Sequence, residues 1–302
     1  MTGRKRSGVG SQFTAAAVDI GGRILAATSP LNALDWLVPR EGYEVARGLA
    51  FGPESRQALD LYWPAAMSGP FPVVVFFYGG SWRWGSREQY RFVGEAMARR
   101  GIMAAVADYR LHPTVQFPAF VEDGAAAVAW VQRHAAAYGG DPKAVFVMGH
   151  SAGAHTGALL MLDRHYLADQ GSTADSVAGF IGISGPYIVD LTQYDSVRTA
   201  FEAWPEPAET IPLSFVRPGA PPMLLFHGLK DTLVYPLNTT RFAAALREAG
   251  SPVSVDLVPG LGHYRVMAAL ATPFRRLAPV ADRVAAFVHA GAGVGSIGQD
   301  HC

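Results

Sequence analysis

Residues 144–153 read AVFVMGHSAG, a short apolar run followed at once by Gly-x-Ser-x-Gly. The apolar run is typical of a buried strand, and the Ala-rich residues after Ser151 are typical of a helix. A serine between such a strand and helix sits on a tight, strained turn, and flanking glycines let neighbouring backbone approach it closely. The pattern therefore predicts that the Ser151 hydroxyl stands at the carboxyl edge of a sheet. An ordinary Gly-rich turn is the alternative.

Similar apolar runs lie on both sides of this segment. Strands that alternate with helices of ten or more residues form a mostly parallel, twisted sheet with helices on both faces, here of about eight strands. We therefore expect an α/β fold. Residues 58–63 alternate with period two, which predicts an outer antiparallel strand with one exposed face. The other expected strands are 72–78, 102–108, 144–149, 179–184, 223–227 and 253–258, and the expected helices are 87–100, 120–138, 152–163, 239–249 and 279–290.

The length of 302 residues allows one large or two small domains, and no repeat or second domain is evident. We expect an N-terminal arm over 1–40, either loose or with a short helix at 31–37, then one domain over 41–290 and a flexible tail over 291–302. Residues 186–220 break the strand and helix alternation with prolines and scattered aromatic residues. That composition predicts a small cap-like insertion that shapes an apolar pocket.

Composition excludes several classes of function. Half of the residues are apolar and 17% are charged, which supports a large core and excludes a disordered or fibrous chain. Lys plus Arg (25) equals Asp plus Glu (25), so no charge pattern for nucleic acid or an acidic membrane is present. The single cysteine, Cys302, excludes an intrachain disulfide and a Cys-based metal cage. No membrane span or standard secretory signal is evident, so we expect a cytoplasmic location, with a degenerate export signal as the alternative.

A serine hydroxyl needs a base to become a nucleophile, and the base needs a carboxylate to orient it. His263 is the preferred base, because it stands in a Gly-flanked loop directly after the strand expected at 253–258. His155 lies on the helix that follows Ser151 and cannot swing round the turn. A solvent-exposed loop histidine is the alternative for His263.

Asp231 is the preferred carboxylate. It follows the strand expected at 223–227 in a sharp turn, whereas Asp256 alternates within a strand and has no defined direction. An Asx-turn aspartate is the alternative for Asp231. We expect His227 to be a structural residue of the same turn.

Two successive glycines follow the strand expected at 72–78, in Tyr78-Gly79-Gly80-Ser81-Trp82. Such a loop leaves backbone N–H groups free to face a ligand. The N–H groups of Gly80 and Ser81, with that of Ala152, are expected to form an oxyanion hole. Trp82, Trp84 and Phe117 are candidates for the wall of a substrate pocket, and core packing is an equal alternative for them.

These residues resemble the α/β-hydrolase superfamily, and within it the carboxylesterases whose oxyanion loop reads His-Gly-Gly-x-Trp. Feruloyl-esterase-like, isoprenylcysteine-methylesterase-like and arylformamidase-like enzymes are similar. The resemblance covers roughly residues 42–290. It implies a triad of Ser151, Asp231 and His263, an oxyanion hole of Gly80, Ser81 and Ala152, no cofactor and no metal. Besides the serine turn, it rests on residues 78–82, on 108–113 (Asp-Tyr-Arg-Leu-His-Pro), on 140–142 (Gly-Asp-Pro) and on the Asp231 and His263 loops.

One residue departs from the family pattern. Tyr78 stands where the family usually has His, and we expect its hydroxyl to brace the loop in place of the imidazole. Asp108 and Arg110 are expected to be structural, pairing with each other or capping neighbouring turns.

The resemblance implies a serine hydrolase, a monomer or homodimer, that cleaves small, short-acyl carboxylic esters through an acyl-enzyme intermediate. An arylformamidase-type amide hydrolase and a serine peptidase stay open, because all three reactions use the same tetrahedral chemistry. From a different class, a ligand-binding receptor on the same fold that does not turn over is the other alternative.

Overall fold

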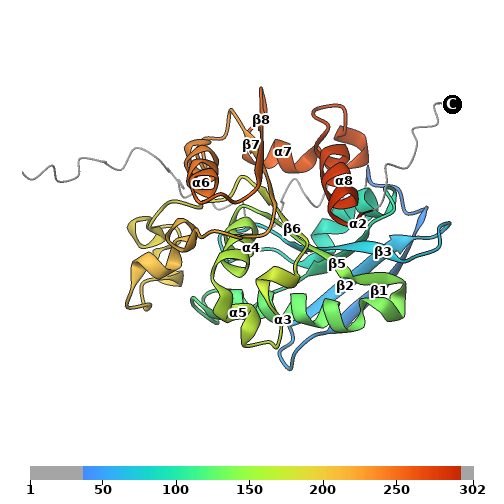
Figure 1. Ribbon diagram of the computed structural model, residues 1–302, viewed down its shortest axis with the longest axis horizontal. Helices are drawn as coiled ribbons and strands as arrows, with labels where there is room; N and C mark the ends of the chain where they lie inside the picture. The colour runs from blue at the N-terminus through green and yellow to red at the C-terminus, as the bar shows by residue number, and fades with distance from the viewer. Residues whose placement is uncertain (1–36, 294–302) are drawn as a thin grey trace, which may run out of the picture.

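Eight strands form one sheet in the computed structural model, which describes residues 37–293. The spatial order is β1-β2-β4-β3-β5-β6-β7-β8, and the six strands from β4 to β8 run parallel (Figure 1). The mostly parallel α/β fold expected from the sequence is confirmed. The strands are β1 (Tyr43–Ala50), β2 (Ala58–Pro64), β3 (Phe71–Phe77), β4 (Met103–Ala107), β5 (Gly140–His150), β6 (Gly179–Ile183), β7 (Met223–Gly228) and β8 (Val253–Val258).

Helices cover both faces of the sheet. Helices α2 and α8 contact each other on one face, and α3 contacts α4 and α5 on the other (Figure 1). Each helix expected between 87 and 290 is present, although those at 87–100 and 120–138 each include a short 3-10 segment. The helices are α2 (Arg91–Ala98, after η1 Arg87–Tyr90), α3 (Ala119–His134, before η2 Ala135–Tyr138), α4 (Ala152–Leu162), α5 (Arg164–Ala168), α6 (Leu237–Glu248), α7 (His263–Ala268) and α8 (Val280–Gly291).

The prediction that residues 58–63 form an outer, half-exposed strand is wrong. β2 does pair antiparallel with β4, but β1 pairs with its other edge, so β2 lies inside the sheet and is almost fully buried. Helix α2 covers one face of β2 so closely that a Cβ on Gly94 would stand 2.4 Å from the Tyr62 ring. β1, which we did not predict, is the half-exposed edge strand.

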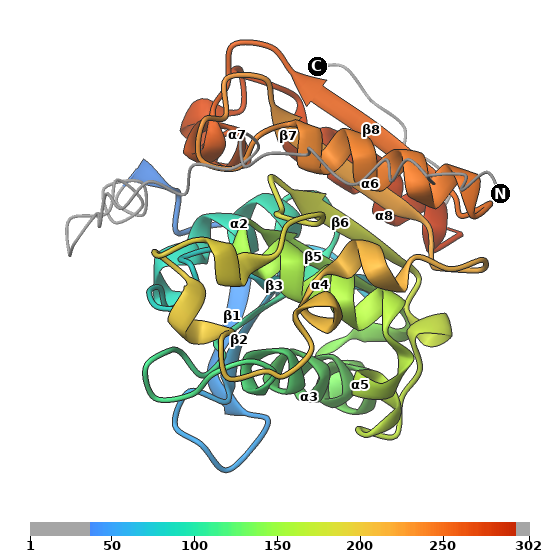
Figure 2. The same cartoon turned by 90° about the vertical axis from the view of Figure 1, so that its left-hand side faces the viewer.

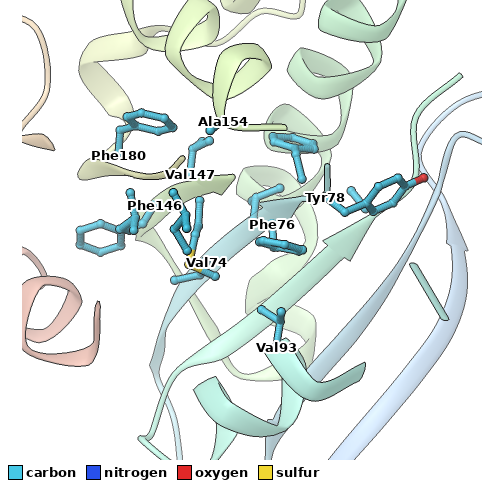
Figure 3. Packing of buried hydrophobic residues seen from close by; sticks show 14 of the residues in the cluster. Val74, Phe76, Tyr78, Val93, Phe146, Val147, Ala154 and Phe180 are labelled. Carbon is cyan, nitrogen blue, oxygen red and sulfur yellow. The ribbon is translucent and has the colours of Figure 1, made fainter. Parts of the chain in front are cut away.

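The centre of the core lies where β3 and β5 meet helix α4. Val74 and Phe76 of β3 and Phe146 and Val147 of β5 are fully buried (Figure 3). Every residue of α4 is buried, as expected of a helix that is apolar on all sides. This packing places the start of α4, and with it Ser151, at the carboxyl end of β5.

The insertion at 186–220 folds as short 3-10 turns beside α4 (Figure 2). Its Phe201 is fully buried and packs edge-on against Trp82, with ring centroids 4.7 Å apart. The aromatic residues therefore point into the core more than was expected of a pocket-shaping cap. The turns are η4 (Leu191–Gln193), η5 (Arg198–Ala200), η6 (Pro207–Thr210) and η7 (Pro212–Phe215).

The ends of the chain are only partly described. The expected arm over 1–40 and helix at 31–37 lie almost wholly outside the described residues, and α8 extends to Gly291, beyond which only 292 and 293 are described. None of the helices in the described part combines the length and apolarity that crossing a bilayer requires.

Candidate active site

Ser151 links β5 to α4 in a strained turn. Its φ of 53° and ψ of −118° lie in a region that a residue with a Cβ seldom adopts, at a cost of about 1–3 kcal/mol. The Ser151 N–H donates to the Ile183 carbonyl at 2.9 Å, and its own carbonyl accepts from the Ala154 N–H at 3.0 Å. The turn at the carboxyl edge of the sheet is therefore the one that the sequence predicts.

The two flanking glycines are required by close backbone contacts. A Cβ on Gly153 would stand 2.0 Å from the Phe77 carbonyl oxygen, and one on Gly149 would stand 2.3 Å from the Gly153 carbonyl oxygen. Both contacts are with backbone, which cannot rotate away as a side chain can. The turn therefore seats α4 directly on the ends of β3 and β5.

We expect Gly153→Ala to destabilise the protein by about 3 kcal/mol or more, because the added methyl group forces α4 away from β3. Gly124→Ala in α3 is the matched control. A Cβ there meets only side-chain atoms, at 3.2 Å or more, and alanine favours a helix by about 1 kcal/mol over glycine. Urea unfolding of both variants measures the difference, and equal midpoints would contradict the role given to Gly153.

Asp231 and His263 are brought together at the carboxyl ends of β7 and β8. His263 Nδ1 lies 2.7 Å from Asp231 Oδ2, and Oδ1 accepts from the N–H groups of Leu233 and Val234, each at 2.9 Å. Both Asp231 and His263 are buried. The sequence predicted His263 in a loop, but it is the first residue of the short helix α7.

The environment of Asp231 favours the carboxylate. Burial alone would raise the pKa of Asp231, but hydrogen bonds from His227 and His263, the charge of His263 and the Val234 N–H outweigh it and lower the pKa below its ordinary value. His227 Nε2 also lies 2.7 Å from the Val234 carbonyl oxygen. His227 thus supports the Asp231 turn, as the sequence suggested.

His150 is a site residue that sequence reasoning missed. Its Nε2 lies 3.1 Å from the His263 carbonyl oxygen, and the two imidazole centroids are 4.8 Å apart. Because a carbonyl can only accept, we assign the proton of neutral His150 to Nε2. The sequence feature that could have indicated His150 is its position inside the Gly-x-Ser-x-Gly motif, directly before Ser151.

His150 adjoins Ser151 in sequence and contacts His263 in space, so it links the serine turn to the start of α7. No hydrogen bond between Ser151 Oγ and His263 forms within residues 37–293. Catalytic hydrogen bonds are often long without substrate and tighten when it binds. Ser151, Asp231 and His263 therefore lie at the same end of the sheet, and of the three pairs only Asp231 and His263 are joined by a hydrogen bond in the described residues.

The glycine loop after β3 lies against the serine turn. A Cβ on Gly79 would stand 2.9 Å from Ser151 Cβ, and the Gly80 carbonyl turns away to accept from the N–H groups of Arg83 and Trp84. Within the described part of the chain, the hydrogen bonds leave the N–H groups of Gly80, Ser81 and Ala152 unused. These are the three donors that the sequence suggested.

The aromatic residues proposed for a pocket wall separate into two groups. Trp82 is 1% exposed and Phe117 is 5% exposed, and both pack on Phe201 of the insertion. Core packing, the alternative reading for them, is therefore favoured. Trp84 is 58% exposed and is the one of the three whose ring is open to a ligand.

His155 lies under the insertion rather than at the site. It is fully buried, and its Nε2 lies 2.7 Å from the Thr210 carbonyl oxygen of η6. Burial lowers the pKa of His155 to about 4. Burial and the nearby charge of His263 lower the pKa of His150 to about 3.

These two histidines predict a loss of stability in acid. Both stay neutral in the folded protein below pH 6.5, whereas the unfolded chain takes up protons there, so stability falls as the pH drops from about 6.5 towards 4. Each contributes up to about 1.4 kcal/mol per pH unit. His155→Gln keeps a donor for the Thr210 carbonyl but cannot titrate. We expect it to remove about half of the pH dependence of the unfolding free energy that His150 and His155 together cause. Urea midpoints between pH 7.5 and 4.5 test this, and an unchanged slope would exclude His155 as a cause.

Two cavities lie away from Ser151. One of about 350 Å³ is lined by residues of β1, β2 and α2, and one of about 380 Å³ lies between the 51–57 turn, α3 and α5. In the described residues, no three His, Cys, Asp or Glu side chains gather as a metal site would need. The chemistry of the side chains, rather than cavity size, selects the site at Ser151.

Comparison with known proteins agrees with this geometry. The family model described as BD-FAE matches residues 59–246. The chain belongs to the BD-FAE family. This family member is 30% identical over 243 residues to a probable isoprenylcysteine alpha-carbonyl methylesterase of Arabidopsis thaliana, covering 72% of this chain and 51% of the relative. It is 31% identical to Esterase LipC of Mycobacterium tuberculosis, covering 73% of this chain and 60% of the relative. The BD-FAE family chain thus spans between half and three fifths of these relatives.

Solved structures show the same fold. Esterase 2 of Thermogutta terrifontis, in a form phosphonylated by sarin, superposes on the BD-FAE family chain with a TM-score of 0.71 at 25% identity, over 87% of this chain and 99% of that one. A bacterial heroin esterase superposes with a TM-score of 0.70 at 23% identity, over 87% of this chain and 88% of that one. The α/β-hydrolase fold is therefore shared with esterases.

Proposed function

We propose that this BD-FAE family chain hydrolyses carboxylic esters through an acyl-enzyme intermediate. Ser151 is the nucleophile, His263 is the general base and acid, and Asp231 orients His263. The observation that carries the proposal is the 2.7 Å contact of His263 Nδ1 with Asp231, at the end of the sheet where the strained Ser151 turn stands. Related esterases of the same fold support it.

The contacts give each group a role. Because Nδ1–H donates to Asp231, the His263 Nε2 lone pair is free to take the Ser151 proton as Oγ attacks the ester carbonyl carbon. The carbonyl oxygen becomes an oxyanion, to which the N–H groups of Gly80, Ser81 and Ala152 donate. His263 then gives its proton to the leaving alcohol, and water releases the acyl group by the same route. Losing one oxyanion donor typically costs about 10²–10³ in rate.

Small, short-acyl esters are the proposed substrates. Thermogutta terrifontis esterase 2, which is 26% identical to this chain, has been solved with bound butyrate and with bound propionate. The curated relatives carry the names methylesterase and esterase. The exposed Trp84 follows the oxyanion loop and is the aromatic residue proposed to contact substrate. Monomer or homodimer and a cytoplasmic location stay predictions from the sequence.

Parallel assays test the proposal. We expect p-nitrophenyl acetate and butyrate to be cleaved faster than p-nitrophenyl octanoate, and all three faster than N-formylkynurenine or a peptide anilide. A large preference for the formamide or the anilide would favour the amide hydrolase or the peptidase. A folded protein that hydrolyses none of them and is never labelled at Ser151 by a fluorophosphonate would favour the receptor.

A further inference from the structure

The loop that carries Gly80 and Ser81 has an uncommon backbone conformation. Ser81 and Trp82 follow one another with φ values of 53° and 54°, in the left-handed region, and Gly80 precedes them at 131°. Two successive non-glycine residues in that region persist only where surrounding groups hold them. This loop therefore needs contacts from neighbouring elements to keep its conformation.

Arg56, from the turn between β1 and β2, contacts both ends of the loop. Its Nη2 donates to the Tyr78 hydroxyl at 2.6 Å and to the Gly85 carbonyl at 2.8 Å, and its Nε donates to the Tyr109 carbonyl at 2.8 Å. One planar guanidinium thereby joins Tyr78 at the start of the 78–87 loop, Gly85 near its end and the segment after β4. The Arg56 side chain is 33% exposed, so it reaches these groups from the surface.

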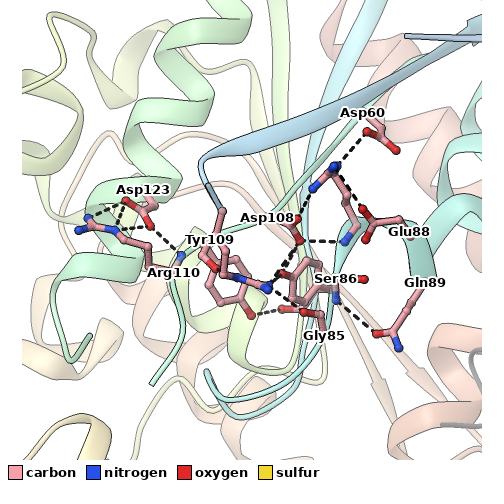
Figure 4. A network of polar contacts seen from close by, with 12 residues as sticks. Asp60, Gly85, Ser86, Glu88, Gln89, Asp108, Tyr109, Arg110 and Asp123 are labelled. Atoms are coloured by element: carbon pink, nitrogen blue, oxygen red, sulfur yellow. Dashed lines mark hydrogen bonds and ion pairs between the residues drawn. The ribbon is translucent and has the colours of Figure 1, made fainter. Parts of the chain in front are cut away.

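Asp108, at the end of β4, completes the same arrangement from the buried side. It accepts from the Tyr78 hydroxyl at 2.7 Å and from the Arg87 N–H at 2.8 Å, and it forms an ion pair with the Arg87 side chain. Figure 4 shows Asp108 between the loop residues Gly85 and Ser86 and its own neighbour Tyr109. The pairing of Asp108 with Arg110 that the sequence suggested is not present. Arg110 pairs with Asp123 instead.

Tyr78 is the group on which Arg56 and Asp108 meet. Its ring stacks on Tyr90 and Tyr109, with centroids 5.1 Å and 4.8 Å away, and its carbonyl accepts from the Tyr109 hydroxyl. Burial raises the pKa of Tyr78, so the neutral phenol both donates to Asp108 and accepts from Arg56. This tyrosine stands one residue before Gly79, which lies against Ser151.

We propose that Arg56 and Asp108 are positioning residues, which clamp both ends of the 78–87 loop and hold the Gly80 and Ser81 N–H groups towards the oxyanion. They touch no reacting atom, and the inference rests on the proposed ester hydrolysis. The clamp is fitted to Tyr78, because the phenol hydroxyl lies between the guanidinium and the carboxylate. The clamp thereby connects the turn between the antiparallel strands β1 and β2 to the loop that carries the proposed oxyanion donors.

The test is Arg56→Gln, a change at a half-exposed side chain that a folded protein tolerates. We expect kcat on p-nitrophenyl butyrate to fall at least tenfold while KM changes less than twofold, since the loop acts on the transition state rather than on the ester. The inhibition constant of a trifluoromethyl ketone, whose adduct places an oxyanion in the hole, should rise by the same factor as kcat falls. Arg56→Lys keeps the charge but not the fork of donors, and should recover part of the loss.

Arg110→Gln is the matched control, because it also removes an ion pair made by an arginine near Asp108, and in the described residues Arg110 bonds to α3 rather than to the loop. It should lower the melting temperature and leave kcat and the ketone constant unchanged. If Arg56→Gln keeps both wild-type values, or if Arg110→Gln loses them equally, the clamp inference is wrong while ester hydrolysis stands. If the wild-type protein hydrolyses no ester, the proposed function fails and the inference fails with it.

Discussion

Ser151→Ala is expected to lower kcat for ester hydrolysis by about 10⁵-fold or more, because no other group can form the acyl-enzyme. The fold should survive, since Ala152 to Leu162 and the Ile183 contact depend on backbone and not on the hydroxyl. Steady-state hydrolysis of p-nitrophenyl butyrate and mass detection of a fluorophosphonate adduct measure the loss. A variant that still shows wild-type turnover would place the nucleophile elsewhere.

Ser184→Ala is a demanding control for this change. Ser184 is a buried serine at the end of the neighbouring strand β6, with a φ of 50°, and its Oγ has no hydrogen-bond partner in the described residues. Like Ser151, Ser184 follows a parallel strand with a φ in the left-handed region, but it is fully buried whereas Ser151 is half-buried. It has no part in the proposed chemistry, so kcat of Ser184→Ala should stay within a few fold of the wild type.

The strain at Ser151 gives a second measurement on the same residue. Ser151→Gly removes the Cβ that is unfavourable at this φ and ψ, so it should be more stable than Ser151→Ala by about 1 kcal/mol while being equally inactive. Equal stabilities of the glycine and alanine variants would mean that the turn is not strained.

Asp231→Asn is expected to lower kcat by about 10⁴-fold. The amide can keep an oxygen towards the Leu233 and Val234 N–H groups, but it then turns an NH₂ group towards His263 Nδ1. The imidazole must take the tautomer with its proton on Nε2, which cannot accept the Ser151 proton. The pH profile of kcat and the stability to urea should be recorded with the rate.

Asp256→Asn is the matched control, since Asp256 is the rival carboxylate weighed from the sequence. Asp256 lies on β8, and its carboxylate pairs with Arg283 of helix α8, whose side chain is 52% exposed. An exposed ion pair contributes about 0–1 kcal/mol, so both rate and stability should stay close to the wild type. A larger loss of rate in Asp256→Asn than in Asp231→Asn would reverse the assignment.

The strands that could be predicted are those whose signal is local. The run before Ser151 and the runs that became β3, β4, β6 and β7 are apolar and bounded by turn residues, and both faces of these strands are covered. β8 was also predicted, although its sequence, VSVDLV, includes polar residues and it is a half-exposed edge strand. β1 was missed because its sequence, YEVARGLA, carries charges and a glycine that are typical of a loop. Only its pairing with β2 makes it a strand, and that pairing places β2 inside the sheet.

The site divides in the same way. Ser151, Asp231 and His263 could be selected from strand ends and spacing, because the carboxyl ends of parallel strands meet at one edge. The helical start at His263, the contact of His150 with the His263 carbonyl and the burial of Trp82 under Phe201 could not. Each depends on a partner that lies far away in the chain.

The amino-acid sequence by itself determined the parallel sheet and the tight serine turn, and it selected the residues that we propose carry the chemistry, because periodicity and steric demands act between near neighbours. Only the tertiary structure decided how those residues are held. Arg56 meets the oxyanion loop, and His150 meets His263, across 113 residues in the second case. Hydrogen bonds over such separations form only after the sheet has brought its strand ends together, so no local pattern contains them.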